Sequence, residues 1–299
     1  MPNTWKLIYS AYDFRQSLIG EFYLICIDEF KTKVFDEATV DCDVLLIQKN
    51  KIQSYILQAN QRSKDLIQRT ITISNVSLSK QYFFNFSLSQ KELLILDKIG
   101  SNSFLIKDYF EIKNGVKPYE VGKGFPPQTQ KILNQKPYTS EVKFDSTFQP
   151  LIGGRYFNKY VILWNKNFWI SYGKWLAAPR EESIFKADEK LIFRQTSDRI
   201  IGTWIQSGFI IRDNTHIILK KNETFNLKYL LGILNSKLID FFYTGINPEK
   251  GEALAQVKAF HLGMLPFYPI DLQEQIPFVE IVDKILTKKN PTLMLIQQN

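Results

Sequence analysis

The spacing of hydrophobic and polar residues divides the chain into three stretches of different character. In the first, helical spacing in FRQSLIGEFY precedes two short apolar runs that predict buried strands, LICID and DVLLIQK. From residue 103 to about 220 come strand-length segments rich in β-branched and aromatic residues, namely SFLIKDYFEI, RYFNKYVILW, FWISY, KLIFRQTS, RIIGTWI, GFIIR and HIILKK. After residue 225 the leucines of FNLKYLLGILNSKLIDFFY recur at three- and four-residue steps, which predicts a helix with one apolar face.

Polar and turn-forming residues between these patterns set the expected boundaries. Residues 50–90 are rich in Gln, Asn and Ser and predict a linker that includes SNVSLSKQYFFNFSLS. A helix follows, with Ser89 as its cap and Gly100 as its stop. The first stretch has too few elements to cover both faces of a sheet, so it must pack on the rest of the chain or on something absent from it.

Helices are expected to end the chain. Asn235 and Ser236 interrupt the leucine-rich helix and can bend or cap it. A last amphipathic helix is expected near Asp271 to Lys288, with Pro277 tolerated if it falls in the first turn. The final NPTLMLIQQN resembles a loosely held tail or a docking extension.

Together these patterns predict an α+β fold, with a β-rich region and C-terminal helices preceded by a partial α/β segment. The expected organisation is a partial α/β segment over 1–60, a linker and helix over 61–102, a β-rich region over 103–225 and a helical part over 226–299.

Positive charge is concentrated in the middle of the chain. Residues 113–220 carry 17 Lys and Arg against 9 Asp and Glu, whereas residues 1–112 carry 13 against 13 and residues 221–299 carry 8 against 8. The whole net charge of +8 therefore lies in the middle segment. Such a block suits a polyanion, because each phosphate neutralised by Lys or Arg releases condensed counterions. A basic, solvated surface is the alternative.

Several classes of protein are disfavoured. Apolar runs stop after four or five residues, far short of the roughly 20 that span a bilayer, and no secretory signal is visible, so we expect a cytoplasmic protein without membrane contact. Cys26, Cys42, His216 and His261 have no metal-ligand spacing, so no metal is expected. Motifs of nucleophilic or zinc-dependent hydrolysis are absent, and the sequence offers no self-sufficient catalytic constellation.

The stretch GVKPYEVGKGFPPQT, residues 115–129, admits three interpretations: a nucleotide-binding loop, a DNA-contacting loop and a surface connector. Its G-x-G lacks the third glycine and the downstream acidic residue of a dinucleotide fingerprint, and it does not fit a phosphate-binding P-loop. The nucleotide interpretation is therefore weak. Four tryptophans lie in the β-rich region, at 164, 169, 175 and 204. Aromatic side chains of strands are expected in the core, and Trp175 is the best candidate for a contact outside it.

These segments resemble a known family. The motifs GVKPYEVGKGFPPQT, FQPLIGGRYFNKY, ISYGKWLAAPR, LIFRQTSDRII, LLGILNSKLIDFFY, NPEKGEALAQVK and LPFYPI follow the order and approximate spacing of the TaqI-like C-terminal specificity domain. That domain is the target-recognition module of adenine-specific DNA methyltransferases, including type IIG restriction-modification enzymes. The resemblance covers roughly residues 103–270, and the LLGILNSKL and LPFYPIDLQEQ runs also resemble type I specificity subunits.

The N-terminal stretch resembles the last helix and strands of the family's methyltransferase domain. The family's Gly-rich S-adenosylmethionine loop, its acidic ribose-binding residue and its NPPY tetrapeptide are not in these 299 residues. The resemblance thus implies a recognition part without its own catalysis or cofactor, whose parent enzyme would use S-adenosylmethionine and can carry a nuclease. The expected partners are double-stranded DNA and a methyltransferase domain or subunit.

The resemblance directs attention to polar side chains of the basic region. Side chains with two polar atoms suit base edges, whereas Lys and Arg suit phosphates. The candidate base readers are Arg155, Arg194, Gln195, Arg199 and Asn214. The candidate phosphate contacts are Lys117, Lys123, Lys174 and Arg180, with Thr129, Tyr156, Thr196 and Ser197 as supporting donors and Trp175 as a stacking candidate.

Each of these assignments has an alternative. Strand alternation would place Arg194 and Thr196 on one face and Gln195 and Ser197 on the other, so at most one pair would face DNA directly. Asp198 can pair with a neighbouring arginine instead. The leading hypothesis is a sequence-specific DNA recognition module. A remnant that acts as a protein scaffold for a methyltransferase subunit, and one half of an active split enzyme, are the alternatives.

Overall fold

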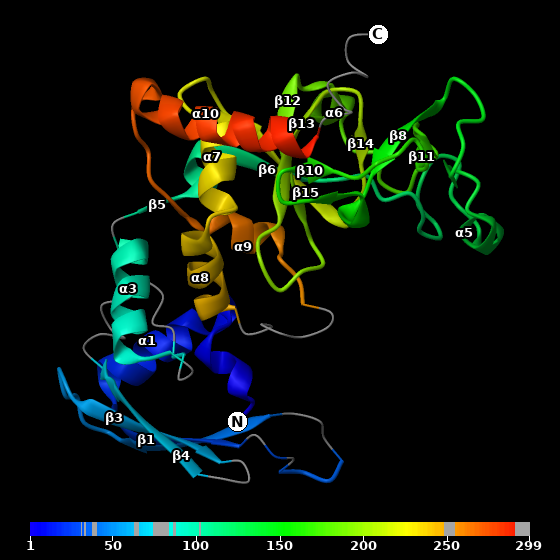
Figure 1. The fold of residues 1–299 in the computed structure, drawn as a ribbon. Helices are drawn as coiled ribbons and strands as arrows, with labels where there is room; N and C mark the ends of the chain where they lie inside the picture. Colours follow the sequence, from blue (N-terminus) through cyan, green and yellow to red (C-terminus); the bar gives the residue numbers. More distant parts are fainter. Residues whose placement is uncertain are drawn as a thin grey trace. The chain divides into compact units, whose positions relative to one another are not determined.

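The computed structural model describes residues 1–30, 32, 34–37, 41–62, 66–73, 84–85, 88–101, 103–247 and 255–290. The chain divides into two compact units (Figure 1). Unit 1 comprises Met1–Ser103 and Phe241–Lys250, and unit 2 comprises Phe104–Asp240 and Gly251–Asn299. The predicted tail lies outside the described residues, apart from Asn290.

Unit 1 is built on a four-stranded sheet of mixed direction with the order β2-β1-β3-β4. Its strands are β1 (Tyr23–Phe30), β2 (Cys42–Gln48), β3 (Ile56–Arg62) and β4 (Leu66–Thr72). Strand β1 pairs antiparallel with β2 and parallel with β3. Leu24 and Ile27 of β1 point to one face, where they form a core with Leu18 and Ile19 of helix α1 (Tyr12–Glu21). Both runs predicted as buried strands are strands, but the prediction of burial is wrong for most of β2, where Val44, Leu46 and Ile47 are exposed.

Residues 56–72 are the first correction to the sequence interpretation, because they form two paired strands where a linker over 50–90 was predicted. Strands β3 and β4 pair antiparallel from Ile56 opposite Thr72 to Arg62 opposite Leu66. Only alternate residues of these strands, such as Leu57 and Ile71, enter the core, and the others are polar or exposed. A strand covered on one face has the polar content of a linker. Most of the run SNVSLSKQYFFNFSLS lies outside the described residues.

Unit 1 also contains η1 (Asn3–Lys6), η2 (Tyr9–Ala11) and α3 (Gln90–Ser101). The predicted cap of α3 is confirmed. The backbone N–H of Ser89 donates to Glu92 at 2.7 Å, and the N–H of Glu92 donates to the Ser89 hydroxyl at 3.4 Å. This reciprocal pair satisfies two N–H groups that the first helical turn leaves unbonded.

Unit 2 contains two four-stranded sheets within the described residues, with the orders β13-β12-β15-β6 and β14-β8-β11-β7, and two smaller pairs, β10-β9 and β16-β5 (Figure 1). Its strands are β5 (Phe104–Leu105), β6 (Phe110–Asn114), β7 (Thr139–Ser140), β8 (Phe148–Ile152), β9 (Phe157–Asn158), β10 (Val161–Ile162), β11 (Trp169–Ser171), β12 (Glu189–Arg194), β13 (Gly202–Gln206), β14 (Ile210–Ile211), β15 (Thr215–Lys220) and β16 (Pro266–Phe267).

One hydrophobic core joins the two larger sheets. Leu151 and Ile170 reach it from β8 and β11, and Ile192 and Ile217 reach it from β12 and β15. All four side chains are fully buried. Short helical segments connect the strands, namely α4 (Ile106–Tyr109), α5 (Gln130–Gln135), η3 (Gly154–Tyr156), α6 (Glu182–Lys186) and α9 (Ala259–Gly263).

The leucine-rich helix is split in two at the predicted interruption. Helix α7 (Leu227–Leu234) ends at Asn235, and α8 (Lys237–Ile246) follows. The buried Asn235 side chain accepts a hydrogen bond from the Gly202 N–H at 3.1 Å and donates to the Gly202 carbonyl at 2.8 Å. This asparagine therefore fixes the end of α7 to the first residue of β13.

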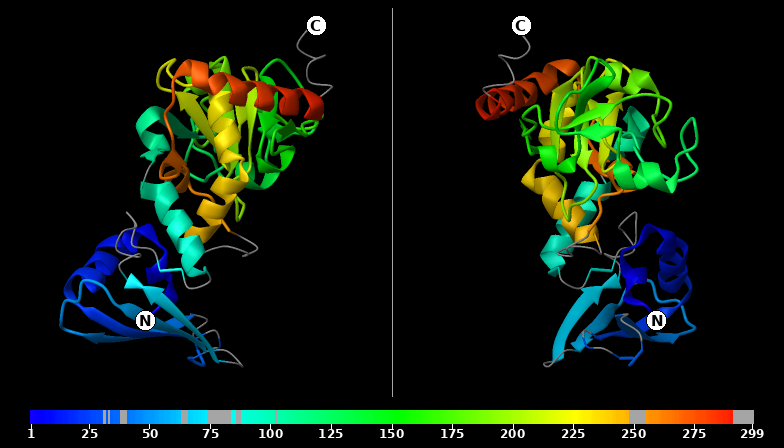
Figure 2. Two further views of the ribbon diagram at one scale, coloured as in Figure 1. Left: turned by 60° about the vertical axis from the view of Figure 1, so that its left-hand side comes forward. Right: turned by 90° about the vertical axis from the view of Figure 1, so that its right-hand side faces the viewer.

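Helix α10 (Leu272–Lys289) packs against α7 and crosses it in the left-hand view of Figure 2. Asp271 caps it in a reciprocal pair with Glu274. Pro277 does not meet the condition of lying in the first turn, because the helix begins at Leu272 and Pro277 is its sixth residue. None of the helices in the described part of the chain combines the length and hydropathy needed to cross a membrane.

Candidate nucleic-acid interface

The stretch 115–129 is held in place by a buried polar side chain. Gln128 is 2% exposed, and its oxygen accepts a hydrogen bond from the Glu120 N–H at 2.9 Å. Its amide nitrogen donates to the carbonyls of Pro118 and Trp175, both at 2.8 Å. Burying an amide is unfavourable unless it is hydrogen-bonded, and here both ends of the amide are. The stretch is therefore a fixed loop attached to the segment that contains Trp175.

Gly124 brings this loop into close contact with the same segment. Its φ of +84° is left-handed, and a Cβ at this position would lie 2.4 Å from the Trp175 carbonyl oxygen. Only glycine fits both conditions. The next residue, Phe125, donates its N–H to the Lys174 carbonyl at 2.9 Å. Because protein backbone occupies this side of Gly124, this glycine serves loop packing, and its position does not fit a nucleotide phosphate.

Three lysines in or beside the loop differ in their partners. Lys117 pairs with Glu120 at 2.6 Å, and this hydrogen bond holds the pKa of the Glu120 carboxyl below its usual value. Lys123 is exposed at the tip of the loop. The Lys174 ammonium lies 4.7 Å from the centroid of the Phe125 ring, which gives a cation–π contact. Lys123 and Lys174 are thus the cations of this loop best placed to meet an external anion.

Three other predicted residues of this region have structural partners. Thr129 caps α5, and its hydroxyl accepts a hydrogen bond from the Ile132 N–H at 3.4 Å. Trp175 donates its indole N–H to the Ser171 carbonyl at 2.9 Å and packs against the core. Arg180 is exposed, but its Nε donates to the Gly115 carbonyl at 3.1 Å.

A second group of predicted residues surrounds the GGR turn that follows β8. The Asn214 side-chain oxygen accepts a hydrogen bond from the Gly154 N–H at 3.2 Å. The Arg155 guanidinium is exposed, and it lies 4.7 Å from the Tyr156 ring centroid. Tyr156 is 7% exposed and stacks on Phe168, so it supports Arg155 from below the surface.

Arg194, at the end of β12, faces this turn from within the fold. Its Nε donates to the Phe157 carbonyl at 3.1 Å, and its terminal nitrogen donates to the same oxygen. Burial lowers the pKa of this guanidinium. A carbonyl oxygen that receives both donors of one arginine face is a structural anchor, and that face is not available to a guanine.

The expected alternation of residues 194–197 is also corrected. Strand β12 ends at Arg194, and the chain then pairs with residues 255–257 instead of continuing the sheet. The Val257 N–H donates to the Gln195 carbonyl at 2.7 Å, and the Ser197 N–H donates to the Ala255 carbonyl at 2.9 Å. Thr196, which bridges to Gln256, is the exposed member of the four.

Residues 211–215 join the two groups. The Val116 N–H donates to the Ile211 carbonyl at 2.7 Å, and the Gly115 N–H donates to the Thr215 carbonyl at 3.3 Å. Between them lies Arg212, which is 42% exposed in its side chain and 3.5 Å from the Asp213 carboxylate. The sequence interpretation missed Arg212. The signal was the polar turn in IIRDNT, which places an arginine two residues before Asn214.

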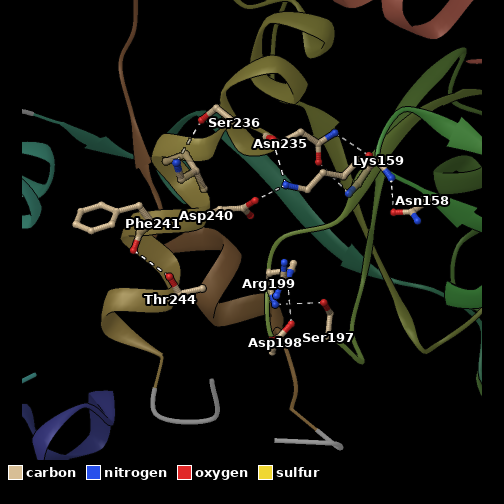
Figure 3. A network of polar contacts seen from close by, with 12 residues as sticks. Asn158, Lys159, Ser197, Asp198, Arg199, Asn235, Ser236, Asp240, Phe241 and Thr244 are labelled. Atoms are coloured by element: carbon tan, nitrogen blue, oxygen red, sulfur yellow. Dashed lines mark hydrogen bonds and ion pairs between the residues drawn. The ribbon is translucent and has the colours of Figure 1, made fainter. Parts of the chain in front are cut away.

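Lys159 is a second residue that the sequence interpretation missed. Its ammonium donates to the Asp240 carboxylate at 2.6 Å and to the Asn235 carbonyl at 3.1 Å (Figure 3). Arg199, in the same view, pairs with Asp198 at 3.1 Å and remains exposed. Asp198 thus has the arginine partner that was considered as an alternative to a base contact.

The β9–β10 hairpin that carries Lys159 is fixed by the residue that follows α10. The Asn290 side chain accepts from the Ile162 N–H at 2.9 Å and donates to the Tyr160 carbonyl at 2.8 Å. The hairpin is thereby attached to both C-terminal helices of unit 2, α7 through Asn235 and α10 through Asn290.

The described residues include no group of three or more His, Cys, Asp and Glu side chains that could hold a metal ion. Cys26 and Cys42 are not joined in a disulfide. His216 is buried, lies 2.8 Å from both Asn114 and the Val257 carbonyl, and burial lowers its pKa. The contacts and the burial of His216 are those of a structural side chain.

Comparison with known proteins finds a family match in the second half of the chain. Residues 149–267 match the TaqI-like C-terminal specificity domain. A type II restriction enzyme and methyltransferase of Methanocaldococcus jannaschii is 27% identical over 164 residues, which are 54% of this chain and 13% of that protein. The chain therefore spans only a small part of this relative's length.

Similar solved structures have low sequence identity. The type IIG restriction endonuclease BpuSI is 10% identical, with a TM-score of 0.39 over 95% of this chain and 41% of that chain. The type IIL restriction-modification enzyme MmeI, solved in complex with DNA, is 12% identical, with a TM-score of 0.40 over 93% of this chain and 46% of that chain. The HsdS subunit from Thermoanaerobacter tengcongensis is 13% identical, with a TM-score of 0.36 over 67% and 44%.

The family match is narrower than the resemblance drawn from the sequence, since it begins at residue 149 and leaves out the loop 115–129. It includes the GGR turn, β12 and the segment around Asn214, which hold the second group of candidate residues. Residues 149–267 of this chain are thus similar to the TaqI-like C-terminal specificity domain.

Proposed function

We propose that unit 2 recognises a specific sequence in double-stranded DNA on behalf of an adenine-specific methyltransferase that lies in a parent protein or a separate subunit. The match of residues 149–267 to a specificity domain carries this proposal. The concentration of the whole net charge of +8 in residues 113–220 supports it, because that segment supplies the loop, the GGR turn and β12. We also propose that the chain acts in the cytoplasm.

The recognition surface divides its work between phosphates and base edges. Contacts to phosphates position the duplex, and bidentate side chains in the grooves read the sequence. Among the predicted residues, Lys123 and Lys174 best fit the first role. Arg155 best fits the second, because it is exposed and held against the Tyr156 ring. Asn214 is also exposed, but its oxygen accepts the Gly154 N–H, so its amide nitrogen is the atom offered to a base. Arg212 joins them as a candidate. Thr196 and Arg199 remain candidates on the exposed turn after β12.

The methyl transfer itself belongs to the partner. A methyltransferase rotates adenine out of the duplex, so a second domain must hold the DNA in register meanwhile. The chain's own G-x-G loop is packed against Trp175, so we assign S-adenosylmethionine to the methyltransferase partner.

Fluorescence anisotropy against a library of duplexes with a randomised central segment tests DNA recognition. We expect selection of a preferred sequence and an affinity that falls steeply as salt rises. Undetectable binding, or binding that is insensitive to salt, would contradict the proposal. The scaffold alternative is not favoured, since the matched residues are those of the specificity domain.

Methyl transfer tests the partnership. A methyltransferase encoded next to this chain, with a Gly-rich loop and NPPY, would be mixed with the full chain and assayed for transfer to adenine. We expect a gain in site-specific activity over the methyltransferase alone. No gain would count against complementation while leaving DNA recognition to the binding experiment.

A further inference from the structure

Phe125 is an exposed aromatic side chain on a fixed backbone. The residue is 63% exposed, although its N–H is bonded to the Lys174 carbonyl at 2.9 Å. On one side Gly124 packs on Trp175, and on the other the buried Gln128 holds the loop. The ring therefore remains in water because the loop holds it there. Burying it would require breaking the hydrogen bonds of Phe125 and Gln128 that fix the loop.

Cations border this ring. The Lys174 ammonium lies 4.7 Å from the ring centroid, and Lys123 is exposed two residues before Phe125. A purely apolar protein partner would have to desolvate both charges, which is costly. A nucleic acid offers flat apolar surfaces, in its bases and deoxyriboses, together with phosphates that match the cations. The combination of a rigid ring and adjacent lysines fits DNA better than it fits a protein surface.

We propose that Phe125 packs against an exposed base step or deoxyribose of the bound duplex as an apolar contact, while Lys123 and Lys174 neutralise the phosphates beside it. The inference rests on the proposed DNA recognition. It assigns to the loop an apolar contact, in addition to the phosphate contacts of the lysines. Apolar side chains that pack on or between base steps stabilise a bent or partly unstacked duplex. Phe125 thus favours a deformed DNA without reading a base edge.

The two kinds of contact predict different salt dependences. A lysine that neutralises a phosphate releases counterions, so its loss reduces the slope of log affinity against log salt by about one. A phenyl ring releases none. Removing the ring must therefore weaken binding equally at every salt concentration, while removing a neighbouring lysine must weaken binding most at low salt.

The test uses the full chain and a duplex selected from the randomised library. Phe125→Ala should bind about tenfold more weakly with an unchanged salt slope, and Phe125→Trp should retain most of the affinity. Lys123→Ala should lower the slope. Phe35→Ala, which removes a 56% exposed ring in unit 1, is the matched control and should bind like the wild type. Circular dichroism and thermal melting verify that each variant is folded.

A duplex with 2-aminopurine placed along the bound site reports unstacking directly. Its fluorescence should rise on binding wild-type protein and rise less with Phe125→Ala. Unchanged affinity of Phe125→Ala, or a loss of affinity that vanishes at high salt, would overturn the inference while DNA recognition stands. Absence of DNA binding by the wild type would instead overturn the proposed function and this inference with it.

Discussion

The side-chain amide of Gln128 donates a hydrogen bond of 2.8 Å to the carbonyl oxygen of Trp175, 47 residues further along the chain. Because the same side chain also bonds Pro118 and Glu120, one buried amide holds the basic loop to the segment that carries Lys174. The position of Lys123 in the loop relative to Lys174 in the other segment thus depends on an uncharged residue, Gln128.

Replacing Gln128 with Ala should destabilise unit 2, since it leaves three backbone groups without their partner. We expect a loss of about 1–3 kcal/mol in the free energy of unfolding, measured by urea denaturation. Gln130→Ala, at an exposed position two residues away, should change it by less than about 0.5 kcal/mol. Equal effects of the two substitutions would show that the buried amide does not hold the loop.

Asn235→Ala should also destabilise the protein, because Gly202 would lose both hydrogen bonds to the break between α7 and α8. The expected loss is about 2 kcal/mol, from two buried backbone groups left unsatisfied. The exposed Asn134 on α5 provides the control, and Asn134→Ala should be close to neutral. A stable Asn235→Ala variant would mean that the end of α7 is fixed by apolar packing alone.

Lys190 should give the protein an unusual alkaline stability profile. The side chain is fully buried and donates to the Phe185 and Ala187 carbonyls, and burial lowers its pKa from 10.5 to about 8. Between these two values the unfolded chain binds more protons than the folded one, so this group makes stability rise with pH, by at most about 1.4 kcal/mol per pH unit. Below the folded pKa its contribution is flat.

The comparison that isolates this effect is the difference in urea midpoint between wild type and Lys190→Met as pH is raised from about 8 to 10.5. The wild type should gain stability relative to the variant over this range. Lys186→Met, which removes an exposed lysine from α6, should run parallel to the wild type. A constant difference between wild type and Lys190→Met would refute a lowered pKa.

Glu120→Gln should strengthen DNA binding. The carboxylate pairs with Lys117 at 2.6 Å, so removing its charge frees the ammonium for a phosphate. We expect a gain of a few-fold at low salt and a steeper salt slope, both read by anisotropy. Lys113 and Glu111 form a comparably exposed pair at 3.0 Å outside the loop, so Glu111→Gln should have a smaller effect. If both substitutions act alike, only the net charge matters.

Arg155→Ala and Arg194→Ala should separate base recognition from structural support. Arg155 is exposed and should cost about 1–3 kcal/mol of discrimination at one base pair, with little change in melting temperature. Arg194 anchors the Phe157 carbonyl, so its loss should lower the melting temperature and weaken binding to all sequences alike. Sequence selection from the randomised library with each variant measures the difference. Relaxed specificity with Arg194→Ala and none with Arg155→Ala would reverse these roles.

The sequence predicted what depends on near neighbours. The cap formed by Ser89 and Glu92 spans three residues, and β12 was visible because its residues Leu191–Phe193 are all apolar and buried. It could not reveal that Arg194 bonds a carbonyl 37 residues away, or that Gln128 holds the loop to Trp175. Both contacts depend on the tertiary structure. The sequence around a polar residue in a basic segment does not indicate whether its side chain bonds to the protein or faces solvent.

The failed prediction over residues 56–72 has the same origin. A strand such as β3, with Gln58 and Arg62 exposed on one side and Leu57 and Ala59 buried on the other, has a composition that an unstructured linker can share. What distinguishes the strand from a linker is its pairing with β1, a strand about 30 residues earlier in the chain. That pairing cannot be read from a local sequence pattern.

The attachment of the β9–β10 hairpin to Asn290 bears on the order in which the protein matures. The ribosome releases Tyr160 and Ile162 early, yet the side chain that bonds them is made 128 to 130 residues later. Domains assemble as they emerge, from the N-terminal side onwards. During translation the Ile162 N–H and the Tyr160 carbonyl of the hairpin therefore lack their Asn290 partner. The hairpin beside Arg155 is fully attached only when α10 and Asn290 have left the exit tunnel.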